Sequence, residues 1–146
     1  MAETLKERLR HDMNEYRRAR DREHLELMTT TISEIRNQEI DLGHELSDDE
    51  VVGVLATAVK RRREAADQMR AGHREELAQK EEREAVALQG YMPAALTEDD
   101  VRALVREAIA AGATNPGLVM RAISPRLKGR FDGKDANRIA RELLGA

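Results

Sequence analysis

The apolar residues of this chain recur at intervals of three and four. Near the N-terminus, Leu5, Leu9 and Met13 follow this spacing, and similar runs return in each later segment. An α-helix completes a turn every 3.6 residues, so residues spaced in this way lie on one face of a helix. The spacing predicts an all-α fold, with about four longer helices followed by three short ones.

The first 92 residues are predicted to form a bundle of about four helices. The second helix carries Leu25, Met28, Ile32 and Ile35, ending near Ile40 to Leu42, and contains the β-prone run Thr29–Thr31. Its helical spacing outweighs that run, and Gly43 is placed to end it. Ser47 followed by Glu50 predicts a capping box for the third helix, which Gly72 ends. The buried face of the third helix is predicted to be Val51, Val52, Leu55, Val59 and Ala66.

The fourth helix, predicted over about 74–91, has the weakest amphipathic pattern. Leu77, Leu88 and Tyr91 share a face, but Glu81 and Glu84 interrupt it. This pattern predicts packing only at the two ends of the helix.

Tyr91–Pro93 marks the predicted boundary between residues 1–92 and a C-terminal domain of residues 93–146, because proline disfavours a helix before it. Thr97, and Asn115 followed by Pro116, are predicted to begin two helices in that domain. Pro125 is predicted to break or kink the second of these helices. Asp132 is placed to cap the last helix.

The composition restricts both the core and the chemistry. Aromatic residues are 2% of the chain and charged residues 36%, which predicts an aliphatic core beneath long solvated helices. The absence of cysteine excludes disulfides, thiolate catalysis and cysteine zinc sites. We expect neither a signal peptide nor a membrane span, since no long apolar run occurs, and therefore a cytoplasmic location.

Positive charge collects near the C-terminus, although the net charge of the chain is −3. Residues 121–141 hold seven basic and two acidic side chains. Within them, Lys128–Lys134 combines two glycines, three cations and an aromatic residue. This stretch is interpreted as a basic loop entering a helix N-terminus, which suits a phosphate. From spacing alone, the more common outcome is a solvated connection in which Asp132 is an ordinary cap.

A second basic run, Lys60–Arg63, lies on the third predicted helix. Glu64 and Asp67 are placed for ion pairs along the same helix, so a solvated face is favoured over a nucleic-acid surface.

Short motifs in a particular order carry a family resemblance. They are Ala19–Asp21, Ile35–Ile40, Glu45–Val51, Lys60–Arg63, Ala71–Arg74, Tyr91–Pro93 and Lys128–Lys134. Taken together they resemble the YqeY family, which shares a domain with the B subunit of glutamine-dependent aminoacyl-tRNA amidotransferases. The resemblance spans nearly the whole chain, and its last two motifs are the most specific.

The resemblance implies an N-terminal bundle and a small three-helix C-terminal domain like the amidotransferase tail that engages tRNA. The tRNA-facing candidates that it transfers are Lys128, Gly129, Arg130, Gly133 and Lys134; Arg126 and Arg138 are added on charge alone. Two departures from the family occur. Met28–Thr31 replaces an apolar-and-arginine run, and Phe131 replaces a small residue. Phe131 either stacks on an unpaired base or, the favoured alternative, packs on the domain core.

No catalytic residue is predicted. The sequence has no Walker loop, its four histidines lack metal-ligand spacing, and none of its serines lies in a nucleophile-elbow motif. We therefore expect no metal and no cofactor. Carbon–nitrogen ligase activity with glutamine as amide donor is linked to this chain by resemblance to the larger relative alone, whose catalytic body is not in this sequence.

Two functions follow as hypotheses. In the first, the chain is an accessory module that binds tRNA or tRNA-like RNA through residues 126–138. In the second, it is an adaptor that docks on an aminoacyl-tRNA synthetase or amidotransferase subunit without contacting RNA. The salt dependence of binding distinguishes them, because contacts with phosphates release counterions.

Overall fold

The computed structural model describes residues 2–145, which contain seven α-helices and no strand. The helices are α1 (Leu5–Ala19), α2 (Arg22–Leu42), α3 (Asp48–Ala71), α4 (Glu75–Gln89), α5 (Glu98–Ala110), α6 (Pro116–Leu127) and α7 (Gly133–Leu144). The predicted all-α class is confirmed. The chain divides into two compact units between Met92 and Pro93.

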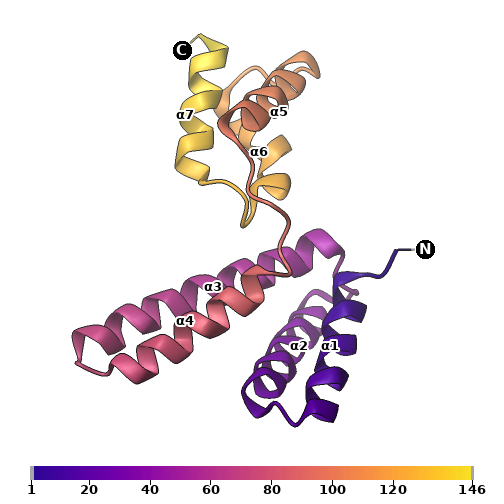
Figure 1. Ribbon diagram of the computed structural model, residues 1–146. Coiled ribbons are helices and arrows are strands. Elements are labelled where there is room, and N and C mark those ends of the chain that lie inside the picture. The colour runs from indigo at the N-terminus through magenta and orange to yellow at the C-terminus, as the bar shows by residue number, and fades with distance from the viewer. Residues whose placement is uncertain (1, 146) are drawn as a thin grey trace. The chain divides into compact units, whose positions relative to one another are not determined.

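In the N-terminal unit, α1 pairs with α2 and α3 pairs with α4, as the ribbon shows (Figure 1). All four helices contribute to one aliphatic core, which includes Leu9 of α1, Ile35 of α2, Leu55 of α3 and Leu88 of α4. The chain just after α4 adds Tyr91 to the same core. With one aromatic side chain among its buried residues, this core depends on branched aliphatic packing, as the composition predicts.

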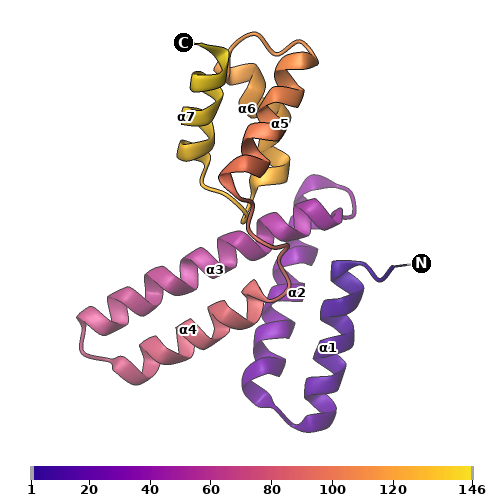
Figure 2. The ribbon, with the colours of Figure 1, turned by 45° about the horizontal axis from the view of Figure 1, so that its top comes forward.

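The C-terminal unit is a three-helix domain in which α5, α6 and α7 each contact the other two (Figure 2). Its core includes Val101 and Val105 of α5, Val119 of α6 and Ile139 of α7. Phe131 is partly buried against this core. The structure therefore supports the packing role of Phe131 rather than a ring free to stack on a base.

Side-chain caps fix where most helices begin. Thr4 with Glu7, Ser47 with Glu50, and Thr97 with Asp100 form capping boxes. The remaining caps are single side chains: Asp21, Asn115 and Asp132 accept backbone N–H groups of α2, α6 and α7. Because each cap satisfies N–H groups that the helix itself cannot, these starts are readable from local sequence.

The run Thr29–Thr31 lies within α2, so the helical spacing prevails over β propensity as predicted. Thr31 is fully buried, and its hydroxyl donates to the Leu27 carbonyl at 2.7 Å. This bond within the helix satisfies the hydroxyl, which would otherwise be costly to bury.

Two expectations for helical faces are wrong. Leu77 is 44% exposed, and the buried residues of α4 are Ala78, Ala85 and Leu88, so α4 packs along its length rather than only at its ends. Small alanines allow close approach to α3, and α4 contacts chiefly that helix, which leaves Leu77 uncovered. Ile40, near the end of the apolar stripe predicted for α2, is 70% exposed.

Two further expectations need correction. Pro125 does not break α6, which continues to Leu127, because the proline falls in the last turn and buried Leu127 follows it.

The run Lys60–Arg63 is not uniformly solvated. Arg62 forms an ion pair with Glu84 of α4 at 3.0 Å, and both side chains are about five-sixths buried. Within the described residues, Glu64 and Asp67 form no ion pair.

Candidate nucleic-acid interface

The loop between α6 and α7 is a structured turn held by backbone hydrogen bonds. The N–H groups of Arg130 and Phe131 both donate to the Leu127 carbonyl, at 2.8 and 3.0 Å. Gly129 has φ +70°, in the left-handed region that glycine adopts without a Cβ clash. Gly129 therefore allows the tight turn between α6 and α7.

Gly133, the second glycine of the loop, does not need to be glycine for its own backbone. It is the first residue of α7, its φ is not positive, and a Cβ built there meets nothing within 4 Å. Of the two glycines, only Gly129 therefore has a backbone conformation that a Cβ would obstruct.

Arg130 fixes the loop against the chain that enters α5. Its Nε donates to the Ala94 carbonyl at 3.1 Å, and its own carbonyl accepts from the Leu96 N–H at 2.9 Å. Its charge also helps to lower the pKa of Asp100, after the larger effect of the bonds from Thr97. Arg130 thus has a positioning role that the sequence did not indicate, because its partners lie more than thirty residues away.

Asp132 fills the N-terminal cap of α7. Its carboxylate accepts the Lys134 N–H at 2.7 Å. A carboxylate at this position already meets the partial positive charge of the helix end and repels an incoming anion. The helix end itself is therefore a poor phosphate site, and any anion contact depends on the side chains of the loop.

The two residues added on charge both face carboxylates. Arg138 pairs with Glu142 at 3.0 Å and lies 3.9 Å from Glu98. Arg102 bridges the same two glutamates, so Arg138 belongs to a network of four charges over α5 and α7. Arg126 is exposed and lies 4.0 Å from Glu107. The network offsets the charge of Arg138, and the contact of Arg126 is looser.

Lys128 and Lys134 differ from these arginines. Both side chains are exposed, and within residues 2–145 neither forms an ion pair. Arg121, which the sequence analysis left out of the candidate set, is also exposed without an ion pair in that range. It lies on α6, seven residues before Lys128, the C-cap residue that follows the helix. Its charge, within the same basic stretch of residues 121–141, was the signal that could have identified it.

Two kinds of feature are absent from the described residues. The described residues contain no group of three His, Cys, Asp or Glu side chains able to hold a metal ion. In that same part of the chain, no helix is long and apolar enough to cross a membrane.

A family model described as "Yqey-like protein" matches residues 6–144. The match includes every candidate residue of the loop and confirms the resemblance drawn from the motifs. The curated proteins give no match to the chain.

Proposed function

This chain belongs to the YqeY family, and from that premise we propose that it is an accessory module that binds tRNA or tRNA-like RNA through the loop between α6 and α7. The observation that carries the proposal is the pair of exposed lysines, Lys128 and Lys134, which flank the loop without carboxylate partners in the described chain. Unpaired ammonium groups are suited to the phosphates of an RNA backbone, and A-form RNA is read largely through such contacts.

Three features support a preformed surface. Gly129 sets the turn, Arg130 ties it to Ala94 and Leu96, and Asp132 caps α7. A surface that is ordered before binding loses less conformational entropy when it meets RNA. In this proposal Lys128 and Lys134 contact phosphates, and Arg121 and Arg126 extend the basic surface along α6. Arg130 and Arg138 instead stabilise the domain through their contacts with Ala94 and with Glu142.

The proposal concerns binding rather than catalysis. The link to amidation of aminoacyl-tRNA comes from the resemblance of residues 93–146 to the amidotransferase tail. By that analogy the chain assists a separate glutamine-dependent enzyme, with tRNA as the shared partner.

The test is the double variant Lys128→Ala/Lys134→Ala, with Arg61→Ala/Arg63→Ala as a control of equal charge change on exposed residues of α3. Fluorescence anisotropy with a tRNA transcript, repeated at several KCl concentrations, gives affinity and salt slope. The loop variant should bind more weakly and lose about 0.7–0.9 of slope for each phosphate contact removed. An equal loss of tRNA affinity in both variants, or no loss of affinity in the loop variant, contradicts the assignment of RNA binding to this loop.

A shallow groove between α5 and α6 favours a second function, the protein adaptor. It is lined by Leu104, Ala108, Ala111, Ala122 and Ile123, with Glu107 and Arg126 also along it. Small apolar residues beside a charged pair suit a docked side chain of a protein partner. Ala122→Gln narrows this groove without changing charge. Loss of binding to a synthetase or amidotransferase subunit in this variant, with tRNA affinity unchanged, supports the adaptor.

A further inference from the structure

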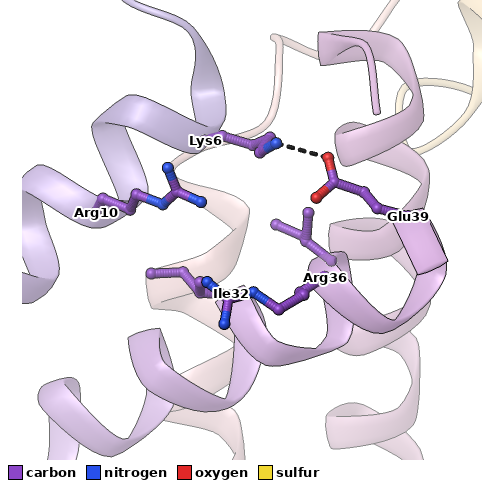
Figure 3. A pocket seen from close by; sticks show the side chains of 6 residues that line it. Lys6, Arg10, Ile32, Arg36 and Glu39 are labelled. Atoms are coloured by element: carbon purple, nitrogen blue, oxygen red, sulfur yellow. Dashed lines mark hydrogen bonds and ion pairs between the residues drawn. The ribbon is translucent and has the colours of Figure 1, made fainter. Parts of the chain in front are cut away.

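A small hollow lies between α1 and α2 in the N-terminal unit (Figure 3). Lys6 and Arg10 of α1 line one side, one helical turn apart. The α2 side consists of Ile32, Ile35, Arg36 and Glu39. Because these residues come from two different helices, the spacing within one helix does not reveal the cluster.

One wall of the hollow is formed by an ion pair between Lys6 and Glu39. Lys6 Nζ lies 2.6 Å from Glu39 Oε2, and the same oxygen accepts the Leu46 N–H at 2.8 Å. The two side chains are only 14% and 17% exposed, and Lys6 also lies 3.3 Å from Glu45. The charge of Glu39 is thus held by Lys6 and by the backbone of Leu46.

In the described chain, the two arginines of the hollow are bonded to no carboxylate, although the charge of Arg10 also acts on Glu39 and helps to lower its pKa. Within residues 2–145, neither Arg10 nor Arg36 forms a hydrogen bond or an ion pair. Both are exposed, and their side chains extend from α1 and α2 to the same opening (Figure 3). Two guanidinium groups at one opening repel each other, and a bound anion removes that repulsion.

We propose that Arg10 and Arg36 together bind a phosphate group at the mouth of this hollow. Guanidinium forks match phosphate oxygens in a bidentate manner. A phosphate supplies more acceptor oxygens than a carboxylate for two forks, and a phosphomonoester brings nearly two negative charges for two cations. Ile32 and buried Ile35 provide the apolar base, and the Lys6–Glu39 pair fixes the wall.

The size of the hollow limits what enters it. Its volume is about 10 Å³, about the minimum for one water molecule. The hollow itself is therefore too small for a phosphate group, which binds at its mouth between the two guanidinium groups, with the rest of the ligand outside. The phosphate comes either from a small phosphomonoester or from an RNA chain. The site is independent of the loop between α6 and α7, so it does not depend on the function proposed above.

The test uses the chain of 146 residues, labelled with ¹⁵N, and inorganic phosphate as the probe. NMR signals of arginine Nε–H groups are followed as phosphate replaces chloride at constant ionic strength. Saturable shifts are expected at Arg10 and Arg36, with Arg61 of α3 as an exposed control that stays constant. Equal, unsaturated shifts at all three arginines would show general screening and overturn the site.

Single variants test whether the two arginines act together. Arg10→Gln and Arg36→Gln should each weaken phosphate binding by about tenfold, which corresponds to about 1.4 kcal/mol. Arg61→Gln should leave phosphate binding unchanged. All three residues are exposed, so helicity measured by circular dichroism should be retained. If only one of Arg10→Gln and Arg36→Gln weakens phosphate binding, the two arginines do not share a site.

The source of the phosphate is identified in the Lys128→Ala/Lys134→Ala background, where the proposed RNA loop is disabled. The probes are an RNA oligonucleotide with and without a 5′-phosphate. An Arg10-dependent preference for the 5′-phosphate indicates a terminal monoester, and equal Arg10-dependent binding indicates internal diesters. Binding of inorganic phosphate without Arg10-dependent RNA binding indicates a small phosphorylated ligand. Failure to bind inorganic phosphate overturns this site and leaves the RNA loop untouched.

Discussion

The hydroxyl of Tyr91 donates a hydrogen bond to the carboxylate of Asp12, a residue 79 positions earlier in the chain. Arg8 lies over the Tyr91 ring, with Cζ 4.6 Å from the ring centroid, and Met28 Sδ is 3.6 Å from the hydroxyl. Tyr91 is 7% exposed. Tyr91, next to the end of the N-terminal unit, therefore contacts α1 through Asp12 and Arg8 and contacts α2 through Met28.

Removing this hydroxyl should destabilise the protein. Tyr91→Phe keeps the ring but leaves the Asp12 carboxylate without its donor. Hydrogen bonds to charged groups contribute about 1.5–3 kcal/mol, so we expect a loss in that range, measured by urea unfolding. Tyr16→Phe is the control, because the Tyr16 ring stacks on His24 and its hydroxyl forms no hydrogen bond within the described residues. Equal stability of the two variants contradicts the role given to the Tyr91–Asp12 bond.

The same pair predicts a pH dependence on the alkaline side. Burial, and then the bond to Asp12, raises the pKa of Tyr91 above its ordinary value of 10.0. A pKa raised by folding means that the stabilisation is complete below the unfolded pKa and declines as pH rises above it. The difference in unfolding free energy between wild type and Tyr91→Phe should therefore be constant below pH 10.0 and shrink at higher pH. A constant difference throughout contradicts this prediction.

The ion pair between Arg62 and Glu84 gives one member of a basic run a distinct role. Arg62 Nε donates to Glu84 Oε2 at 3.0 Å, and Arg62 Nη1 donates to the Ala58 carbonyl at 3.2 Å. Arg62→Ala should cost about 1–3 kcal/mol, because it leaves the largely buried Glu84 carboxylate with only the longer contact to Lys80, at 3.9 Å. Arg61→Ala and Arg63→Ala should stay within about 0.5 kcal/mol. Thermal unfolding of the three variants measures the contrast, and a uniform effect contradicts it.

Residues near in sequence were predicted better than contacts across the fold. The caps at Ser47, Thr97, Asn115 and Asp132 depend on partners within three residues, so local spacing identified them. The exposed position of Leu77 depends on which elements happen to cover it, and no local pattern contains that information.

The candidate site follows the same division. Lys128 and Lys134 are identifiable from charge in a glycine-containing loop. The bond from Arg130 to Ala94 and the pairing of Arg138 with Glu142 and Glu98 require the folded domain. The sequence identifies the cations, but only the folded structure shows which of them already pair with a carboxylate or a carbonyl.

The stability of the N-terminal unit should fall in acid because of Glu39. The bond from Lys6, and then that from the Leu46 N–H, lowers the pKa of Glu39 below its ordinary value of 4.5. A lowered pKa means that the stabilisation is present above the unfolded value and is lost as pH falls through the folded one. Glu39→Gln should therefore lose less stability than wild type as pH falls below 4.5. Urea unfolding at several pH values measures this slope.

The control for that prediction is Glu45→Gln. Glu45 also contacts Lys6, at 3.3 Å, but its side chain is 90% exposed. Solvent screens an exposed pair, so this variant should keep the acid slope of the wild type. If Glu39→Gln follows the wild-type slope as closely as Glu45→Gln does, the Lys6–Glu39 pair does not contribute to the acid dependence.

The two glycines of the loop should respond in opposite ways to alanine. Gly129→Ala places a Cβ at φ +70° and should destabilise the C-terminal unit by about 1–2 kcal/mol. Gly133→Ala adds a methyl group into open space at the start of α7 and should stabilise by up to about 1 kcal/mol. Thermal unfolding of both variants tests the difference. Two losses of equal size contradict the distinction between the glycines.

Gly133→Ala also distinguishes two ways in which RNA can meet this loop. The Asp132 carboxylate already occupies the end of α7, so we expect phosphates to contact the lysine side chains and not the helix backbone. The variant should therefore bind a tRNA transcript with unchanged affinity and salt slope, while Lys128→Ala/Lys134→Ala loses both. If Gly133→Ala folds more stably yet binds tRNA more weakly, the phosphate approaches the backbone at Gly133, and the cap at Asp132 must open when RNA binds.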